Sequence, residues 1–301
     1  MFRRLNFLLQ NLYKAIVPEC MQSRLTPALI RAWLSMSAIV THRRKKRLDY
    51  VEVRITDHCN LNCKSCAQFS PLAESKYIEA KAFTNDFQRL YAITNGCIKT
   101  IRLMGGEPLL HPRLLELMRG VRGIFDKSRI VLVTNGILLS KQSDSFWDTC
   151  RDMDVEVLIS HYPVKIDYQS LLAISGRHSV KLRYATRKPQ VMYKWAFDVD
   201  GKQNVEKNFY KCYFGNNCVQ VDNGKLYNCS LIPCIKYFNN YFGKDMRITS
   251  GDSIDIYEHR DIGSILDFLA RPVPFCKYCN LDKVKYGEKW ESSKKVIGEW
   301  T

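Results

Sequence analysis

The chain has 301 residues, of which 46% are hydrophobic, and this fits a globular protein with one full domain and a smaller second one. It contains no uninterrupted run of 18 or more apolar residues, so a membrane-spanning helix is not expected. The net charge of +16 favours anionic partners, such as phosphorylated substrates or an anionic membrane surface. The twelve cysteines lie mostly in short clusters, which favours metal binding in a reducing compartment over disulfide bonds.

Residues 1–48 predict a basic, amphipathic helical extension. Apolar side chains recur on one helical face, at Phe2, Leu5, Leu8, Leu9, Leu12 and Ile16. A basic run follows at residues 42–47, and residues 1–50 hold ten basic against two acidic residues, a net charge of +8. Two hypotheses stay open: the extension lies on a membrane surface as a peripheral contact, or it packs on the main domain.

Residues 49–200 predict an α/β domain, because expected strands and helices alternate. The strands are expected at residues 51–56, 100–104, 129–134, 155–160 and 180–184, with a sixth between 190 and 200. The helices are expected at residues 84–95, with Thr84 as N-cap, 112–121, with proline in the first turn, 143–150 and 167–175. Such alternation implies parallel strands joined by right-handed crossovers. In βα barrels the active site lies at the carboxyl ends of the strands.

Three motifs stand at these carboxyl ends. The first places Cys59, Cys63 and Cys66 directly after the first strand at C-x3-C-x2-C spacing. Three close thiolates can hold three irons of a [4Fe–4S] cluster and leave the fourth iron without a protein ligand, whereas ferredoxins usually supply four cysteines. The alternative is a zinc knuckle with His58 as the fourth ligand. The other two motifs are Gly105-Gly106-Glu107 and Thr134-Asn135-Gly136.

This combination resembles the radical S-adenosylmethionine (radical SAM) superfamily, over residues 51–184. The resemblance implies a partial (β/α)6 TIM-like barrel. It also implies that the three cysteines hold a [4Fe–4S] cluster whose open iron binds SAM, and that reductive cleavage of SAM yields a 5′-deoxyadenosyl radical. By the same resemblance the SAM amine contacts Gly105, Gly106 and Glu107, and the SAM ribose contacts Ser160.

The sequence departs from the family pattern at Ser65, where the family often has an aromatic residue near the adenine. Serine cannot supply that contact, so it is expected from elsewhere, with Phe69 as the candidate. His161 and Tyr162 follow the fourth strand and are expected to line the mouth of the barrel.

Residues 201–301 predict a small Cys-rich domain. Residues 219–221 and 225–227 flank Asn223-Gly224, which predicts a hairpin, and residues 262–270 predict a helix. The cysteine spacing resembles the SPASM domain in its shorter, twitch form. That resemblance implies a second, auxiliary [4Fe–4S] cluster on Cys212, Cys229, Cys276 and Cys279, with Cys218 and then Cys234 in reserve. A structural zinc site on the same four thiols is the alternative. The remaining Cys20, Cys97 and Cys150 are expected to be ordinary apolar residues.

Three functional hypotheses follow. The first is a radical SAM enzyme, of oxidoreductase or isomerase type, that abstracts hydrogen from a small polar substrate such as a phosphorylated or sugar-type molecule. The second is a radical SAM maturase or activase acting on a peptide or protein, and the third is a non-catalytic iron–sulfur or zinc protein. An electron donor such as flavodoxin or ferredoxin is expected, in the cytoplasm or at the inner membrane face. No nucleic-acid partner is expected, because no clear binding motif is present.

Overall fold

The computed structural model describes residues 47–301 except for 186–190, 213 and 216–217. Almost all of the predicted extension 1–48, including Cys20, therefore lies outside the described residues. Residues 47–301 make up one compact unit. Within the described part of the chain, no helix is long and apolar enough to cross a membrane.

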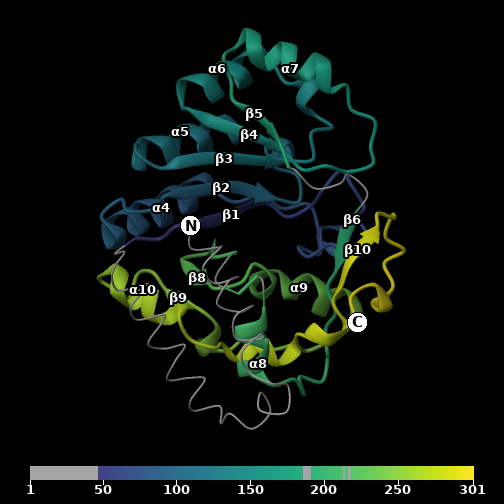
Figure 1. Ribbon diagram of the computed structural model, residues 1–301. Helices are drawn as coiled ribbons and strands as arrows, with labels where there is room; N and C mark the ends of the chain where they lie inside the picture. Colours follow the sequence, from purple (N-terminus) through teal and green to yellow (C-terminus); the bar gives the residue numbers. More distant parts are fainter. Residues whose placement is uncertain (1–46, 186–190, 213, 216–217) are drawn as a thin grey trace, which may run out of the picture. The chain divides into compact units, whose positions relative to one another are not determined.

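The fold is α/β, with an open, mostly parallel sheet that forms a partial barrel (Figure 1). The strand order is β5-β4-β3-β2-β1-β7-β8-β9, and β1 to β5 are parallel neighbours. Their bounds are β1 (Val51–Thr56), β2 (Thr100–Gly105), β3 (Arg129–Thr134), β4 (Val155–Ile159) and β5 (Leu182–Tyr184). The edge beyond β1 consists of β7 (Gln220–Asp222), β8 (Lys225–Tyr227) and β9 (Ile254–Asp255). Because β7 pairs with β1 in parallel, the predicted hairpin extends the main sheet.

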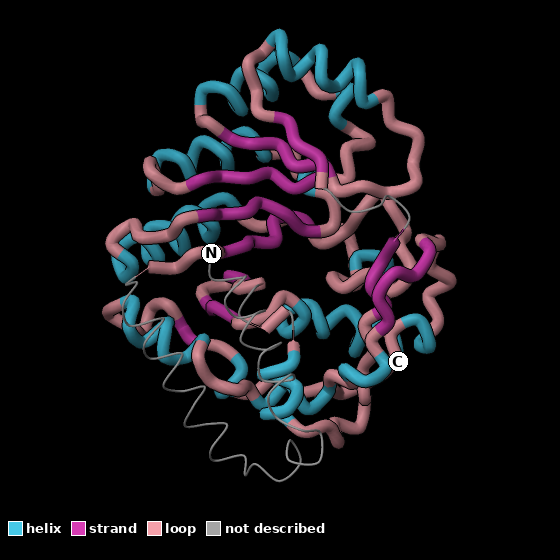
Figure 2. Tube along the Cα trace, viewed as in Figure 1, coloured by secondary structure: helices cyan, strands magenta, loops and turns pink. Residues whose placement is uncertain are grey.

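One predicted strand has a different partner. The segment expected to supply the sixth barrel strand forms β6 (Val191–Lys194), which pairs antiparallel with β10 (Lys285–Lys289). Figure 2 shows this pair apart from the main sheet. The prediction of a sixth barrel strand between residues 190 and 200 is therefore wrong, because this segment pairs with β10 and β5 stays at the edge of the main sheet.

The five expected helices are present with shifted bounds, whereas the helices at Val205–Lys211 and Leu231–Phe242 were not predicted. The structure has α4 (Ala80–Thr94), α5 (Leu114–Ile124), α6 (Asp144–Asp152), α7 (Tyr168–Arg177), α8 (Val205–Lys211), α9 (Leu231–Phe242) and α10 (Ile262–Leu269). Helix α4 begins before Thr84, since Glu79 is the N-cap, so that prediction is wrong. Helix α5 begins after Pro112, because a 3-10 turn at Pro108–Leu110 precedes it and His111 Nδ1 accepts a hydrogen bond from Arg113 N.

Two apolar cores hold these layers together. In the larger core, Val51, Val53 and Ile55 of β1 pack with Phe83 and Phe87 of α4 and with the corresponding faces of the neighbouring strands and helices. Strand side chains alternate, so Glu52, Arg54 and Thr56 lie on the opposite, inner face of the sheet. The second core is aromatic and joins Phe69, at the end of the Cys-containing loop, to α9 and to Trp300 near the C-terminus.

Candidate functional site

Cys59, Cys63 and Cys66 lie in the Cys loop, residues 57–68, which leaves the carboxyl end of β1. The buried side chain of Arg54 in β1 fixes both ends of this loop. Its guanidinium donates to the Asp57 side chain at 2.9 Å and to the Asp57 carbonyl at 2.6 Å. It also donates to the Gln68 carbonyl and side-chain oxygens, each at 2.9 Å. The loop ends are therefore held by charge-assisted hydrogen bonds rather than by helix or strand.

Two of the three thiols receive N–H donors. Leu61 N and Asn135 Nδ2 lie 3.3 Å and 3.7 Å from Cys59 Sγ. The indole Nε1 of Trp290 lies 3.3 Å from Cys63 Sγ. Donors directed at sulfur stabilise the negatively charged thiolate form, which is the form that binds metal.

The surroundings otherwise keep the free thiols of Cys59 and Cys63 protonated. Burial, with smaller contributions from Glu107 and Cys66, raises the pKa of Cys59 to about 11. Burial and then the neighbouring Cys66 and Cys59 raise the pKa of Cys63 to about 12. These mutual effects require the three thiols to lie near one another. Such a group becomes a set of thiolates only when a cation supplies the compensating charge, and soft sulfur donors fit iron–sulfur clusters and zinc.

No group of three or more His, Cys, Asp or Glu side chains in the described part of the chain is arranged to hold a single metal ion. A [4Fe–4S] cluster needs a different arrangement, because each of its thiolate ligands binds a separate iron. His58, the zinc alternative, has its Nε2 3.5 Å from Ser75 Oγ and 3.4 Å from Tyr77 Oη.

Gly105 and Gly106 bring the end of β2 against the backbone of the Cys loop. A Cβ atom on Gly105 would lie 2.2 Å from Thr56 O, and one on Gly106 would lie 1.9 Å from His58 O. This close approach allows Gly106 N to donate to Thr56 O at 2.7 Å and Glu107 N to donate to His58 O at 3.0 Å. Glycine is thus required at both positions for the contact between the end of β2 and the Cys loop. Contact of these two glycines with SAM stays a prediction.

Glu107 is fully buried and connects β2 with β3. Its carboxylate accepts hydrogen bonds from Leu109 N at 3.0 Å, Thr134 Oγ1 at 2.6 Å and Asn135 N at 2.9 Å. Burial raises its pKa, and these three hydrogen bonds oppose that effect. Asn135 in turn donates to Asn60 Oδ1 at 2.7 Å. The structure therefore joins all three sequence motifs into one hydrogen-bonded network at the carboxyl edge of the sheet.

The end of β4 adds two residues to this edge. Ser160 follows β4 and its N–H donates to Thr134 O at 2.8 Å, beside the residues that hold Glu107. Burial, the thiols of the Cys loop and Glu107 raise the pKa of Tyr162 well above its usual value. His161 stacks on Tyr184, with ring centroids 5.7 Å apart. Sequence reasoning placed both at the mouth and assigned neither a role.

Phe69 does not supply an adenine contact. Its ring is fully buried against Phe197, Phe238 and Trp300, so neither face is open to a ligand and that prediction is wrong. Ser65, the departure from the family pattern, is also buried, with φ at 55°, and its hydroxyl donates to Glu299 O.

Residues 290–300, the C-terminal strap, also hold the Cys loop, and sequence reasoning missed this. Lys64 N donates to Glu291 O at 2.9 Å, and Ser293 N donates to Asn62 O at 2.7 Å. The indole of Trp300 donates to Cys66 O at 3.0 Å. No local sequence signal predicts such pairing between segments more than 220 residues apart.

A second group of cysteines lies in the C-terminal part. Cys212, Cys229, Cys276 and Cys279, the four predicted auxiliary ligands, line one small cavity together with Trp195 and Asn208. Asn208 Nδ2 donates to Cys276 O at 2.8 Å and also to Cys279 O, which fixes the C-x2-C turn. Burial raises the pKa of each of the four thiols, and most of them also raise one another's. The indole Nε1 of Trp195 is buried in this cavity wall beside Cys279, and its N–H opposes the rise in the pKa of that thiol.

The reserve cysteines lie differently. Cys234 is on the buried face of α9, and its Sγ accepts a hydrogen bond from Arg54 Nη1 at 3.2 Å. Cys218 lies close enough to Cys229 to raise its pKa but is not among the residues that line the cavity. Cys150 is buried and Cys97 is exposed.

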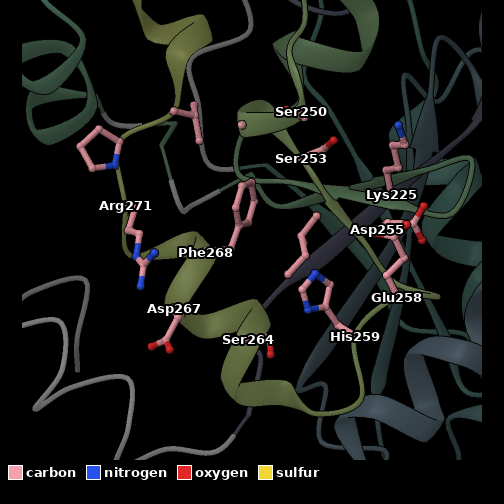
Figure 3. A pocket seen from close by; sticks show the side chains of 14 residues that line it. Lys225, Ser250, Ser253, Asp255, Glu258, His259, Ser264, Asp267, Phe268 and Arg271 are labelled. Atoms are coloured by element: carbon pink, nitrogen blue, oxygen red, sulfur yellow. The ribbon is translucent and has the colours of Figure 1, made fainter.

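A larger cavity, of about 630 Å³, lies elsewhere, between α10 and the segment that carries β9. Figure 3 shows Phe268 and charged groups of both signs around it, including Asp267, Arg271 and Glu258. None of the predicted site residues lines this cavity.

Comparison with known proteins gives a family match. Residues 53–182 match the model of the Radical SAM superfamily. GTP 3′,8-cyclase of Chlorobaculum tepidum is 32% identical over 115 residues, which are 38% of this chain and 34% of that protein. GTP 3′,8-cyclase of Helicobacter pylori is 33% identical over 96 residues, 32% of this chain and 30% of that protein. The chain thus spans about a third of the length of these curated relatives. The solved structure of BtrN in complex with AdoMet and 2-DOIA aligns with 77% of this chain and 93% of its own, at 15% identity and a TM-score of 0.48.

Proposed function

We propose that this chain, a member of the radical SAM superfamily, cleaves SAM reductively and abstracts hydrogen from a small polar substrate. The observation that carries the proposal is the network that ties the three motifs together, from Glu107 through Asn135 to Asn60 and Cys59. The matched family has a [4Fe–4S] cluster and SAM. When bound, they supply an electron for the cleavage and a 5′-deoxyadenosyl radical for the abstraction.

Cys59, Cys63 and Cys66 are the proposed ligands of this cluster. Their soft sulfur atoms are suitable ligands for iron. The N–H groups that donate to Cys59 and Cys63 favour the thiolate form. Gly105, Gly106, Glu107 and Ser160 are the proposed SAM contacts, since they end β2 and β4 beside the Cys loop. Glu107 holds Thr134 and Asn135 in place, and it orients Asn135 toward Cys59.

The inner face of the sheet supports a small polar substrate. Arg102, Glu52 and Gln220 pair side by side across β2, β1 and β7, and Glu52 and Gln220 are buried. Within the described residues, Arg102 Nε and both amide atoms of Gln220 have no hydrogen-bond partner. Buried polar atoms without partners are costly, so a polar molecule or ordered water is expected there. Arg102 favours an anionic group, in keeping with the GTP substrate in the name of the cyclase relatives.

We also propose an auxiliary [4Fe–4S] cluster on Cys212, Cys229, Cys276 and Cys279. The shared cavity supports this choice over the reserve cysteines, and the N–H of Trp195 beside Cys279 favours the thiolate form of that ligand. Four ligands leave no iron open, so the residues around this site suit electron transfer during an oxidation or an epimerisation. A flavodoxin or ferredoxin donor, a cytoplasmic location and membrane contact through residues 1–47 are further proposals.

The test uses the anaerobically reconstituted full chain with dithionite and SAM. The proposal expects release of 5′-deoxyadenosine. This release should be lost in Cys63→Ala but kept in Cys97→Ala, because Cys97 is exposed and lies outside the Cys loop. Deuterium transfer from labelled sugar phosphates, nucleotides or a peptide into 5′-deoxyadenosine then identifies the substrate class. Intact SAM with reduced, iron-replete protein would refute the proposed function.

A further inference from the structure

We propose that Trp290 is a positioning residue that raises the reduction potential of the cluster on the Cys loop through its N–H bond to Cys63. This inference rests on the proposed function, because it needs a cluster held by Cys59, Cys63 and Cys66. The contact is between Trp290 Nε1 and Cys63 Sγ, at 3.3 Å. The indole N–H is a donor only, so the sulfur is necessarily the acceptor.

The C-terminal strap holds the indole in place. Trp290 follows β10 directly, and β10 is anchored by its pairing with β6. Just beyond it, Ser292 pairs with Cys63 in an antiparallel bridge. Lys64 N donates to Glu291 O at 2.9 Å, and their side chains form an ion pair. The donor is therefore fixed on both sides along the chain, and little reorganisation is needed when the charge on sulfur changes.

The sign of the effect follows from charge. Reduction adds an electron to the cluster, and part of the added negative charge lies on the ligand sulfurs. Hydrogen bonds to charged acceptors are about twice as strong as those to neutral ones. The Trp290 bond consequently stabilises the reduced cluster more than the oxidised cluster and raises the potential. Hydrogen bonds to the sulfurs are among the factors that set cluster potentials.

Burial strengthens this effect. Cys63 is only 6% exposed, and Trp290 is half-buried. In such a site the bond is screened less than in water. Cys59 Sγ accepts hydrogen bonds from Leu61 N and Asn135 Nδ2. Trp290 gives Cys63, a second proposed ligand, an N–H donor of the same kind. A higher potential would ease loading of the cluster with an electron and make donation of that electron to SAM correspondingly harder, so Trp290 would set the balance between the two.

The experiment compares Trp290→Phe with the wild-type full chain. Both are reconstituted anaerobically, checked for iron and sulfide, and titrated potentiometrically with electron paramagnetic resonance as the readout. The signal that changes on addition of SAM belongs to the Cys-loop cluster, which separates it from any auxiliary cluster. We expect the ratio of reduced to oxidised cluster at a fixed potential to fall about tenfold in Trp290→Phe, equivalent to about 59 mV for one electron.

Trp300→Phe is the matched control, because its indole donates to the carbonyl of Cys66 and not to a sulfur. An unchanged potential in Trp290→Phe, or an equal shift in both variants, overturns the inference. If Trp290→Phe assembles too little cluster, 3-benzothienylalanine at position 290 keeps the shape and removes the N–H, with the same expected shift. A wild-type chain without a SAM-sensitive cluster refutes the proposed function instead, so the two failures are distinguishable.

Discussion

Replacing Gly106 by alanine should destabilise the whole edge that carries the Cys loop. The added Cβ would lie 1.9 Å from His58 O, so the end of β2 or the loop must move by about 1 Å or more to reach normal contact. Such a shift breaks the bonds from Gly106 N to Thr56 O and from Glu107 N to His58 O. Each bond contributes about 1 kcal/mol, and overpacking costs about 1–3 kcal/mol. The expected loss is about 3–5 kcal/mol, a large part of the roughly 5–15 kcal/mol that stabilises a typical domain.

The measurement is urea denaturation of the cluster-free protein under reducing, anaerobic conditions, followed by circular dichroism. Gly120→Ala in α5 is the matched control, because the nearest atom to its Cβ is 3.9 Å away. It should raise stability by about 0.5–1 kcal/mol, since alanine is the better helix former. Equal stability of the two variants would contradict the close approach of β2 to the Cys loop.

Three further predictions concern other parts of the molecule. Arg54→Met should cost about 3–5 kcal/mol of unfolding free energy, because it removes the charge-assisted hydrogen bonds of a buried guanidinium to Asp57 and Gln68. Arg113→Met removes an exposed i,i+3 pair and should cost about 0–1 kcal/mol, and denaturant titration checks both. Burial lowers the pKa of His111, so near that pKa the unfolded chain binds a proton that the folded chain does not. The free energy of unfolding should therefore fall as the pH drops below about 6.5. In denaturation experiments at several pH values, His111→Gln should make this fall smaller. Cys276→Ala should reduce reconstituted iron from about eight to about four per chain, while Cys97→Ala should leave it unchanged.

The alternation of strands and helices was predictable because it is encoded locally. Strand β3 gives a short apolar run, β1 alternates apolar and polar residues, and amphipathic helices give a different period. The register of the sheet was not encoded locally. Nothing in the segment of β6 indicates that it pairs antiparallel with β10, near the C-terminus, rather than in parallel with β5. The expected sixth strand was wrong for that reason.

Helix α9 was missed although its sequence carried a signal. Leu231, Ile232, Ile235 and Phe238 are buried at helical spacing. Pro233 lies in the first turn, where proline is tolerated. The cysteines and turn residues around this segment led to a prediction of metal ligation and of no helix. The helix places Cys234 beside Arg54, and this contact separates it from the four cysteines that share the cavity.

The sequence predicted the residues of the candidate site, but not most of the contacts that hold the Cys loop in place. Cysteines, glycines and Glu107 are rare combinations that stand out in a sequence, so all three motifs were found. Apart from Asn135 of the third motif, the Cys loop is held by ordinary residues whose importance is purely spatial: Arg54 and the two indoles of the strap.

Some of the contacts that hold the Cys loop come from outside the segment that matches the family model. The matched segment ends at residue 182, whereas Trp290, Ser293 and Trp300 contact the Cys loop from outside it. The loop has little regular structure of its own beyond short turns, so its shape depends on those contacts as well as on Arg54 within the match. Under the proposed function, changes in these contacts outside the matched segment would alter the reduction potential of the cluster without any change in its three proposed ligands.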